Sequence, residues 1–215
     1  MNSQKLRHVI LTRFNLGLYD KPGANEWMEH RFPLFDKTRQ SILEQDGEFE
    51  WWLSMDGRTP EKWINRIFTD SRMRITSDHP KDFRCDGWTI TTRMDNDDLY
   101  LPGAVKAIQE SASKQEMVLD LRYFGMSGGK LYHSGRVQPN SPFLSLVENG
   151  VKRTCYARPH SNMLEEYKSI FVSRDEYALM VIHDRNLGNR VVGREVNFRD
   201  LPKHKRDYIK KYLQS

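Results

Sequence analysis

Three aspartates crowd into four consecutive positions near the middle of the chain: Asp95, Asp97 and Asp98. The preceding run at residues 89–92 is rich in β-branched side chains, which favour a strand, and a proline–glycine pair then opens a segment with helical spacing. Because carboxylates this close repel one another, the cluster predicts a cation among them. Hard divalent ions such as Mg²⁺ and Mn²⁺ take oxygen ligands and often share them with substrate phosphates.

Three interpretations compete for this acidic turn. The first is a solvated turn that caps the positive end of the following helix. The second, an EF-hand loop, is disfavoured, because counting from Asp95 places Leu99 at a ligand position, Tyr100 at the turn glycine and Lys106 at the bidentate glutamate. The third is an Asp-x-Asp metal turn that holds a nucleotide diphosphate at the end of a parallel strand, where open α/β sheets bind their ligands.

Polar side chains also follow the first two expected strands. The strand expected at residues 8–16 ends in three candidate nucleotide-binding residues, Thr12, Arg13 and Asn15. The strand expected at residues 49–55 ends at Asp56, which either contacts a base or ribose or only forms an Asp-Gly turn. For Arg13, a surface ion pair is the competing interpretation.

A histidine and an asparagine follow the last apolar run of the chain. Residues 177–182 predict a strand that delivers His183 and Asn186 into a turn. A histidine at a strand end is commonly a hydrogen-bonded structural residue. Histidine is also a common metal ligand, and a position beside the expected nucleotide site favours a metal or phosphate contact.

Strands and helices alternate in the first half of the chain. Further strands are expected at residues 73–76 and 89–92, with helices from about Pro33 to Gly47, from Thr59, and from residue 102 to about 113. Residues 18–25, which contain another proline–glycine pair, are expected to form a loop. The alternation predicts an α/β fold with a mixed, mainly parallel sheet flanked by helices.

The second half of the chain has a different pattern. A strand at residues 116–124, a turn at Gly128 and Gly129 and a returning strand at 130–133 predict a hairpin. Residues 145–148 are either helical or extended, and residues 153–157 form another candidate strand. We expect a single domain over residues 1–215, with halves at about 1–115 and about 116–215.

Composition and charge limit the class of protein. The chain is 38% hydrophobic and 29% charged, as in globular proteins, and no run reaches the roughly 18 apolar residues of a membrane span. A polar N-terminus predicts no signal peptide. Cys85 and Cys155 lack metal-ligand spacing and indicate reduced thiols, so we expect a cytoplasmic protein.

The net charge of +5 suits an anionic ligand or the negative face of a membrane. The basic segment 202–215 is expected to form either a solvated terminal helix or a contact with anionic lipid at the inner face of a membrane. Elsewhere the positive charge is dispersed, so we expect no nucleic acid partner.

Several of these pieces together resemble a rhamnosyltransferase family of nucleotide-sugar glycosyltransferases. The matching pieces are residues 8–15, 91–98, 145–148, 158–161 and 181–187, which cover most of the chain in order. The run Arg-Met-Asp-Asn-Asp-Asp within 91–98 is the most specific of them. The resemblance implies a GT-A fold, with a Rossmann-like half that binds the nucleotide sugar and a smaller acceptor half that contains the hairpin.

The resemblance also implies roles for the residues of the acidic turn. Asp95 and Asp97 would be the Asp-x-Asp pair, coordinating Mn²⁺ or Mg²⁺ between the two phosphates of the donor. Asp98 would bind metal-bound water or a sugar hydroxyl, and Asn96 would lie within the donor site. Arg93 would neutralise phosphate or orient the aspartates. The C-terminal metal ligand would be His183, or His160 as second choice.

The chemistry of glycosyl transfer suits these residue types. Negative charge develops on the departing diphosphate, and a metal with nearby basic groups stabilises that charge. An inverting enzyme also needs a carboxylate base for the acceptor hydroxyl, for which Asp120 and Glu148 are the main candidates besides Asp98. Glu148 is favoured because a family-like piece ends on it, and a retaining mechanism stays open.

We therefore predict a metal-dependent glycosyltransferase that moves a sugar to a glycan or lipid-linked acceptor, with rhamnose implied only by the family name. One alternative is a phosphatase with an aspartate nucleophile, but that motif usually lies near the chain start and here Arg93 and Met94 precede it. The other is a basic module that binds glycans or nucleic acid without catalysis. That module would show clustered basic residues with exposed aromatics, whereas most aromatics here fall in apolar runs.

Overall fold

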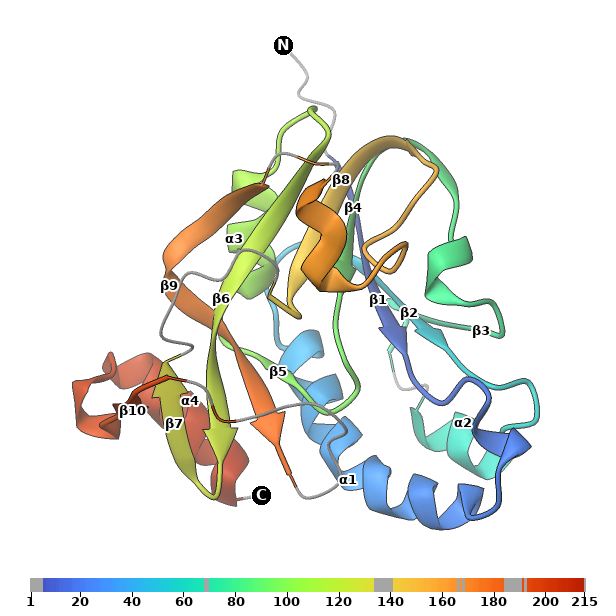
Figure 1. The fold of residues 1–215 in the computed structure, drawn as a ribbon. Coiled ribbons are helices and arrows are strands. Elements are labelled where there is room, and N and C mark those ends of the chain that lie inside the picture. Colours follow the sequence, from blue (N-terminus) through green and yellow to red (C-terminus); the bar gives the residue numbers. More distant parts are fainter. Residues whose placement is uncertain are drawn as a thin grey trace.

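The computed structural model describes residues 6–67, 70–133, 141–165, 167, 169–183, 191 and 193–214. A mixed sheet runs through the molecule with the order β10-β7-β6-β8-β4-β1-β2-β3 (Figure 1). Its parallel part consists of β1 (Arg7–Arg13), β2 (Glu50–Ser54), β3 (Met73–Thr76) and β4 (Cys85–Arg93). The predicted α/β class, with a mixed sheet flanked by helices, is confirmed. The expectation that the sheet is mainly parallel is wrong, because four strand pairs of the described residues are parallel and five are antiparallel.

The second half of the chain extends this sheet with strands of both directions. Strand β8 (Leu144–Val151) lies antiparallel between β4 and β6 (Met117–Ser127), and β7 (Lys130–His133) forms the predicted hairpin with β6. The short β10 (Glu195–Val196) pairs with β7. The long β9 (Ser169–Ile182) runs parallel to β6 and also pairs with β5 (Leu99–Tyr100).

Side chains on the two faces of the sheet enter different cores. Ile10 packs with residues of α1 (Ala24–Leu43), α2 (Glu61–Ile67) and α3 (Ala104–Ser111), whereas its neighbours Val9 and Leu11 face the opposite side. That opposite core includes residues from the segments around the 3₁₀ turns η2 (Pro80–Asp82) and η3 (His160–Glu165). Alternation along β1, a period of two, therefore separates the helical face from the face covered by loops.

Helix α1 begins earlier than the sequence predicted. It starts at Ala24, directly after Gly23 with a φ of 81°, and Pro33 lies inside it rather than at its first turn. A proline inside a helix removes one backbone hydrogen bond. The expected start at Pro33 was wrong because burial of the apolar face formed by Met28, Phe32 and Phe35 outweighs that loss.

Two ambiguous segments of the second half are settled. Residues 145–148, expected to be helical or extended, lie within β8. The strand expected at residues 153–157 is wrong, because the chain turns there and its polar groups bond elsewhere. The Thr154 hydroxyl donates to the Pro80 carbonyl over 3.0 Å, and the Cys155 amide donates to the Thr91 hydroxyl over 3.2 Å.

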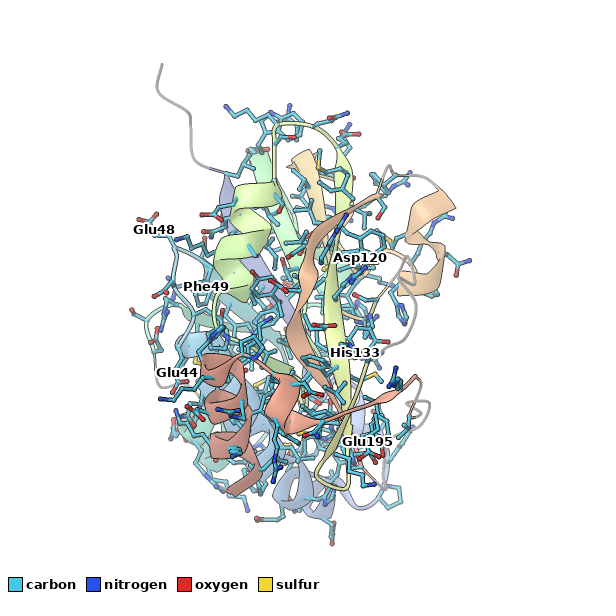
Figure 2. All side chains as sticks on the ribbon, turned by 90° about the vertical axis from the view of Figure 1, so that its left-hand side faces the viewer. Glu44, Glu48, Phe49, Asp120, His133 and Glu195 are labelled. Carbon is cyan, nitrogen blue, oxygen red and sulfur yellow. The ribbon has the colours of Figure 1, made fainter. Side chains whose placement is uncertain are left out.

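The basic C-terminal segment forms α4 (Lys203–Gln214), at the side of the sheet that carries β7 and β10 (Figure 1). Ile209 and Tyr212 are buried in a core shared with β5, β6 and β9. Lys211 pairs with Glu44, which lies next to α4 in Figure 2. The apolar side of α4 therefore packs against the sheet. Among the helices of the described residues, none is both long and apolar enough to cross a membrane.

A buried polar chain crosses the sheet at His8. His8 Nε2 lies 2.7 Å from the Thr92 hydroxyl, which lies 2.7 Å from the Ser145 hydroxyl. The Gln109 amide nitrogen lies 3.3 Å from His8 Nδ1. Since that amide nitrogen can only donate, Nδ1 accepts, and the ring is the neutral Nε2–H tautomer. Burial lowers the pKa of His8 from 6.5 to about 3.

We expect His8 to make the protein sensitive to acid. Because the folded pKa lies below the unfolded one, the unfolded state binds the extra proton between these values. Stability is therefore fully present above pH 6.5 and falls by about 1.4 kcal/mol per pH unit as pH drops toward 3. Urea unfolding from pH 7 to 5 should show a shallower acid loss in His8→Gln, by about 2 kcal/mol at pH 5. The exposed control His204→Gln should follow the wild type, and equal slopes for all three proteins would contradict the assignment.

Candidate functional site

The acidic turn lies beyond the carboxyl ends of β1 and β4. These strands are parallel neighbours, yet the chain leaves β1 toward β2 and β3 on the other side, which makes the β1–β4 edge a topological switch point. The Met94 amide donates to the Leu11 carbonyl over 3.1 Å, and the Asn96 side-chain amide donates to the Phe14 carbonyl over 2.7 Å. The turn is therefore fixed across the crevice where an open α/β sheet binds its ligand.

Asp97 is the point where three elements converge. Its Oδ2 lies 3.0 Å from Nε2 of His183, which directly follows β9. The same oxygen accepts a hydrogen bond from Nη1 of Arg31 on α1. The His183 ring also meets the ring of His30 edge-on, with centroids 5.9 Å apart. Asp97 is only 7% exposed. The end of β9 brings it an imidazole nitrogen from His183, and α1 brings it the positive charge of Arg31.

Asp95 is more open than Asp97 and has its own arginine. Its side chain is 35% exposed, and Arg93 donates to both of its oxygens over 3.2 Å. The Arg93 guanidinium lies 5.0 Å from the ring centroid of Tyr156. Burial alone would lower the pKa of Arg93, but Asp95 and Tyr156 hold that pKa above its usual value. A fixed positive charge therefore stands beside the carboxylate nearest to solvent.

Asp98 turns away from the crevice toward β9. Its Oδ1 accepts a hydrogen bond from the Val181 amide over 2.9 Å. Burial raises the pKa of Asp98 well above its usual value, and the charges of Asp97 and Asp95 raise it further. Because Val181 lies two residues before His183, this bond ties the acidic turn to the strand end that carries the histidine.

Three of the predicted nucleotide-binding residues are buried in the framework of the strand ends. The Thr12 hydroxyl accepts from the Trp51 indole over 3.0 Å. Asn15 accepts from the Asp56 amide over 3.0 Å and donates to the Thr59 hydroxyl over 3.0 Å. Asn96 is bound to the chain after β1, as described above. Thr12, Asn15 and Asn96 thus hold the ends of β1, β2 and β4 in place.

Two other candidates lie at the same edge. Arg13 is exposed at the end of β1. The Asp56 carboxylate accepts three hydrogen bonds from Arg58, at 2.8 to 3.0 Å. These bonds hold the pKa of Asp56 well below its usual value, so this carboxylate stays ionised. The expected Asp-Gly turn is present, with its charge already paired.

The two main candidates for a catalytic base lie at different heights of the sheet. Glu148 pairs with Thr89, four residues before Arg93, which is about 13 Å along the strand from the acidic end. Its carboxylate accepts from the amides of Lys152 and Arg153 and from the Tyr167 hydroxyl. The structure therefore does not bring Glu148 together with the acidic turn.

Asp120 lies closer to the acidic turn. Thr92 of β4 pairs with Ser145 of β8, so the next residue of β4, Arg93, lies level with Leu144. Leu144 in turn pairs with Asp120 of β6. Two strand spacings, about 10 Å, separate the backbones of Arg93 and Asp120. Asp120 is fully buried on β6, where it pairs with β9 (Figure 2). Its carboxylate accepts a hydrogen bond from the Ser141 amide.

The remaining predicted ligands are less clearly placed. His160 begins η3 and is half-buried. Asn186 lies outside the described residues. Within the described part of the chain, no group of three or more His, Cys, Asp or Glu side chains is arranged to hold a metal ion.

The pair Asp97 and His183 nevertheless fits a metal that a substrate helps to hold. A carboxylate oxygen and an imidazole nitrogen lie 3.0 Å apart. Carboxylates bind Mn²⁺ and Mg²⁺, and a neutral imidazole is a common metal ligand in proteins. Such ions commonly take one or two protein ligands and complete their shell with phosphate oxygens and water. Asp95 lies two residues before Asp97, but its carboxylate forms an ion pair with Arg93.

Sequence reasoning missed Arg31 and His30. The spacing of Met28, Arg31, Phe32 and Phe35 places Arg31 on the apolar face of a helix. This signal is visible only when the helix begins at Ala24 rather than at Pro33. A small cavity of about 110 Å³ also adjoins Asp97. It is lined mainly by apolar side chains from α1, β5, β6, β9 and α4: Leu34, Lys37, Leu99, Met126, Val181, Tyr212 and Leu213.

Comparison with known proteins gives this chain no family: no protein-family model matches it, and neither does any curated protein.

Proposed function

We propose that this protein is a metal-dependent glycosyltransferase of the GT-A type, which moves a sugar from a nucleotide diphosphate sugar to a hydroxyl acceptor. The observation that carries the proposal is the convergence of Asp97, His183 and Arg31 beyond the carboxyl ends of β1 and β4. A metal-bound diphosphate is stabilised where metal ligands and positive charge lie close together beyond the carboxyl ends of strands. Asp97 and His183 would supply the metal ligands there, and Arg31 the positive charge.

Different residues of the site would bind different parts of the donor complex. Asp97 and His183 would hold Mn²⁺ or Mg²⁺, which supplies a Lewis acid for the charge that develops on the departing diphosphate. Arg93, held by Asp95 at the more open side, adds a fixed positive charge for the same oxygens. Asp98 binds no substrate in this proposal and instead locks the turn to β9.

The register of the sheet favours Asp120 over Glu148 as the base for the acceptor hydroxyl. Asp120 lies level with Arg93, whereas Glu148 pairs with Thr89 at the middle of β4 and has three donors of its own. A base must lie within hydrogen-bond reach of the proton that it takes. The acceptor would therefore enter along β6, in the second half of the chain.

A calorimetric panel tests this function. Nucleoside diphosphates of each base, and their sugar conjugates, are titrated into the protein with Mn²⁺ and then with EDTA. We expect one base to bind only with Mn²⁺, and its sugar nucleotides to be hydrolysed slowly in the absence of acceptor. If no nucleoside diphosphate binds in the presence of Mn²⁺, the proposal is wrong.

A further inference from the structure

A buried arginine with few partners stands at the centre of the site. Arg31 is 8% exposed, and its bond to Asp97 is its one hydrogen bond among the described residues. Its Nε is buried and has no partner there. A guanidinium has five N–H donors, and buried donors are normally satisfied. Arg31 therefore has capacity for an anion that the protein itself does not supply.

The orientation of Arg31 is set by its own helix. Its guanidinium carbon lies 5.2 Å from the ring centroid of Trp27, four residues earlier on α1. A guanidinium stacked on an aromatic ring keeps its edge free to bind oxygen atoms in its plane. The arginine can thus change its partner at that edge while the stacking on Trp27 is retained.

The other charges of the turn leave Arg31 dependent on Asp97. Asp95 is paired with Arg93, and Asp98 is bonded to the Val181 amide. If Asp97 Oδ2 becomes a metal ligand, the cation competes directly with Arg31 for the same oxygen. An arginine that lost this partner would be a buried unpaired charge, which is strongly unfavourable. A diphosphate arriving with the metal would supply the replacement anion.

We infer that Arg31 is a diphosphate-binding residue that neutralises Asp97 in the ligand-free protein and exchanges it for the donor diphosphate when the metal binds. This inference rests on the proposed function. It has a thermodynamic consequence: metal alone must displace Arg31 without compensation, whereas metal with diphosphate satisfies both groups. The two ligands therefore bind with positive coupling, and each strengthens the other by the same factor.

The test measures two affinities with opposite expected signs. Binding of Mn²⁺ alone is followed by the electron paramagnetic resonance signal of the free ion, and binding of the preformed Mn²⁺–pyrophosphate complex by calorimetry. In Arg31→Met, Mn²⁺ alone should bind about five- to tenfold more tightly, because its competitor is gone. The Mn²⁺–pyrophosphate complex should bind at least about tenfold more weakly.

A matched control and a conservative variant separate this role from a structural one. Arg39→Met removes an arginine of the same helix, paired with Asp36, and should change neither affinity. Arg31→Lys keeps the charge without the planar fork. It should leave Mn²⁺ binding near that of the wild type and weaken the pyrophosphate complex severalfold, a result that stands even if Arg31→Met does not fold.

The possible failures are distinguishable. If Arg31→Met weakens both affinities or changes neither, or if Arg31→Lys binds the pyrophosphate complex like the wild type, the exchange role is wrong while the glycosyltransferase proposal stands. If the wild type binds neither Mn²⁺ nor its pyrophosphate complex, the proposed function fails and this inference fails with it.

Discussion

Asp97→Asn is expected to abolish Mn²⁺-dependent binding of the donor nucleotide and to lower the rate of sugar transfer by about 10³-fold or more. Asparagine keeps the size of the side chain and an oxygen that can accept from Arg31. It loses the negative charge, however, and a neutral amide oxygen is a weak ligand for a divalent ion. The effect should therefore be on metal binding rather than on folding, and thermal unfolding should show that the variant folds.

The control for this experiment is Asp70→Asn. Like Asp97, Asp70 is paired with an arginine, in this case Arg72 two residues later. Asp70 precedes β3, however, and lies at the amino end of that strand. Its loss removes the same charge and should leave metal-dependent binding unchanged. Full donor binding by a folded Asp97→Asn protein would refute the role of Asp97 as a metal ligand, on which the proposed function depends.

The acidic turn and His183 could be predicted because each depends on local sequence. A strand followed by an acidic turn and a helix places Asp95 and Asp97 at a carboxyl edge, whatever the rest of the chain does. An apolar run likewise delivers His183 to the end of a strand, here β9. What no local pattern could show is that β9 crosses to β5, so that His183 meets Asp97 across 86 positions.

The contribution of α1 could not be predicted for a physical reason. Pro33 reads as a helix start because its missing N–H is harmless in a first turn. In the structure the long apolar face of α1 outweighs that preference, and the helix reaches back to Ala24. This extension of nine residues carries His30 and Arg31 to the site. A tertiary effect, the burial of Met28 and Phe32, thus decided a local boundary.

The position of the candidate base depended on strand register. The choice between Asp120 and Glu148 follows from the antiparallel return of β8 between β4 and β6, which runs Glu148 away from the acidic edge. Register is fixed by which face of each strand is buried and by the connections between strands. Residues 145–148 alone were compatible with a helix or a strand, so the direction of Glu148 could not be derived from them.

Phe35→Ala should be the most destabilising of these substitutions and should also weaken donor binding. Phe35 is fully buried on α1, and its ring lies 4.7 Å from that of Phe14 after β1 and 5.7 Å from that of Trp51 on β2. Truncation removes these contacts and leaves a cavity, at a cost of about 3–5 kcal/mol. Against a total stability of about 5–15 kcal/mol for a domain, that loss is large.

The same ring also sets the distance between α1 and the strand ends. Arg31 lies four residues before Phe35, so a helix that settles into the cavity moves the guanidinium relative to Asp97. Urea unfolding measures the loss of stability, and Mn²⁺–nucleotide binding by the fully folded variant at low temperature measures the effect of the shifted Arg31.

Phe35→Leu, which fills most of the space, should show smaller losses of both stability and binding. Phe171→Ala, at a 39% exposed aromatic, should cost less than about 0.5 kcal/mol. Equal stability of Phe35→Ala and Phe171→Ala would mean that the aromatic cluster does not hold α1 against the sheet.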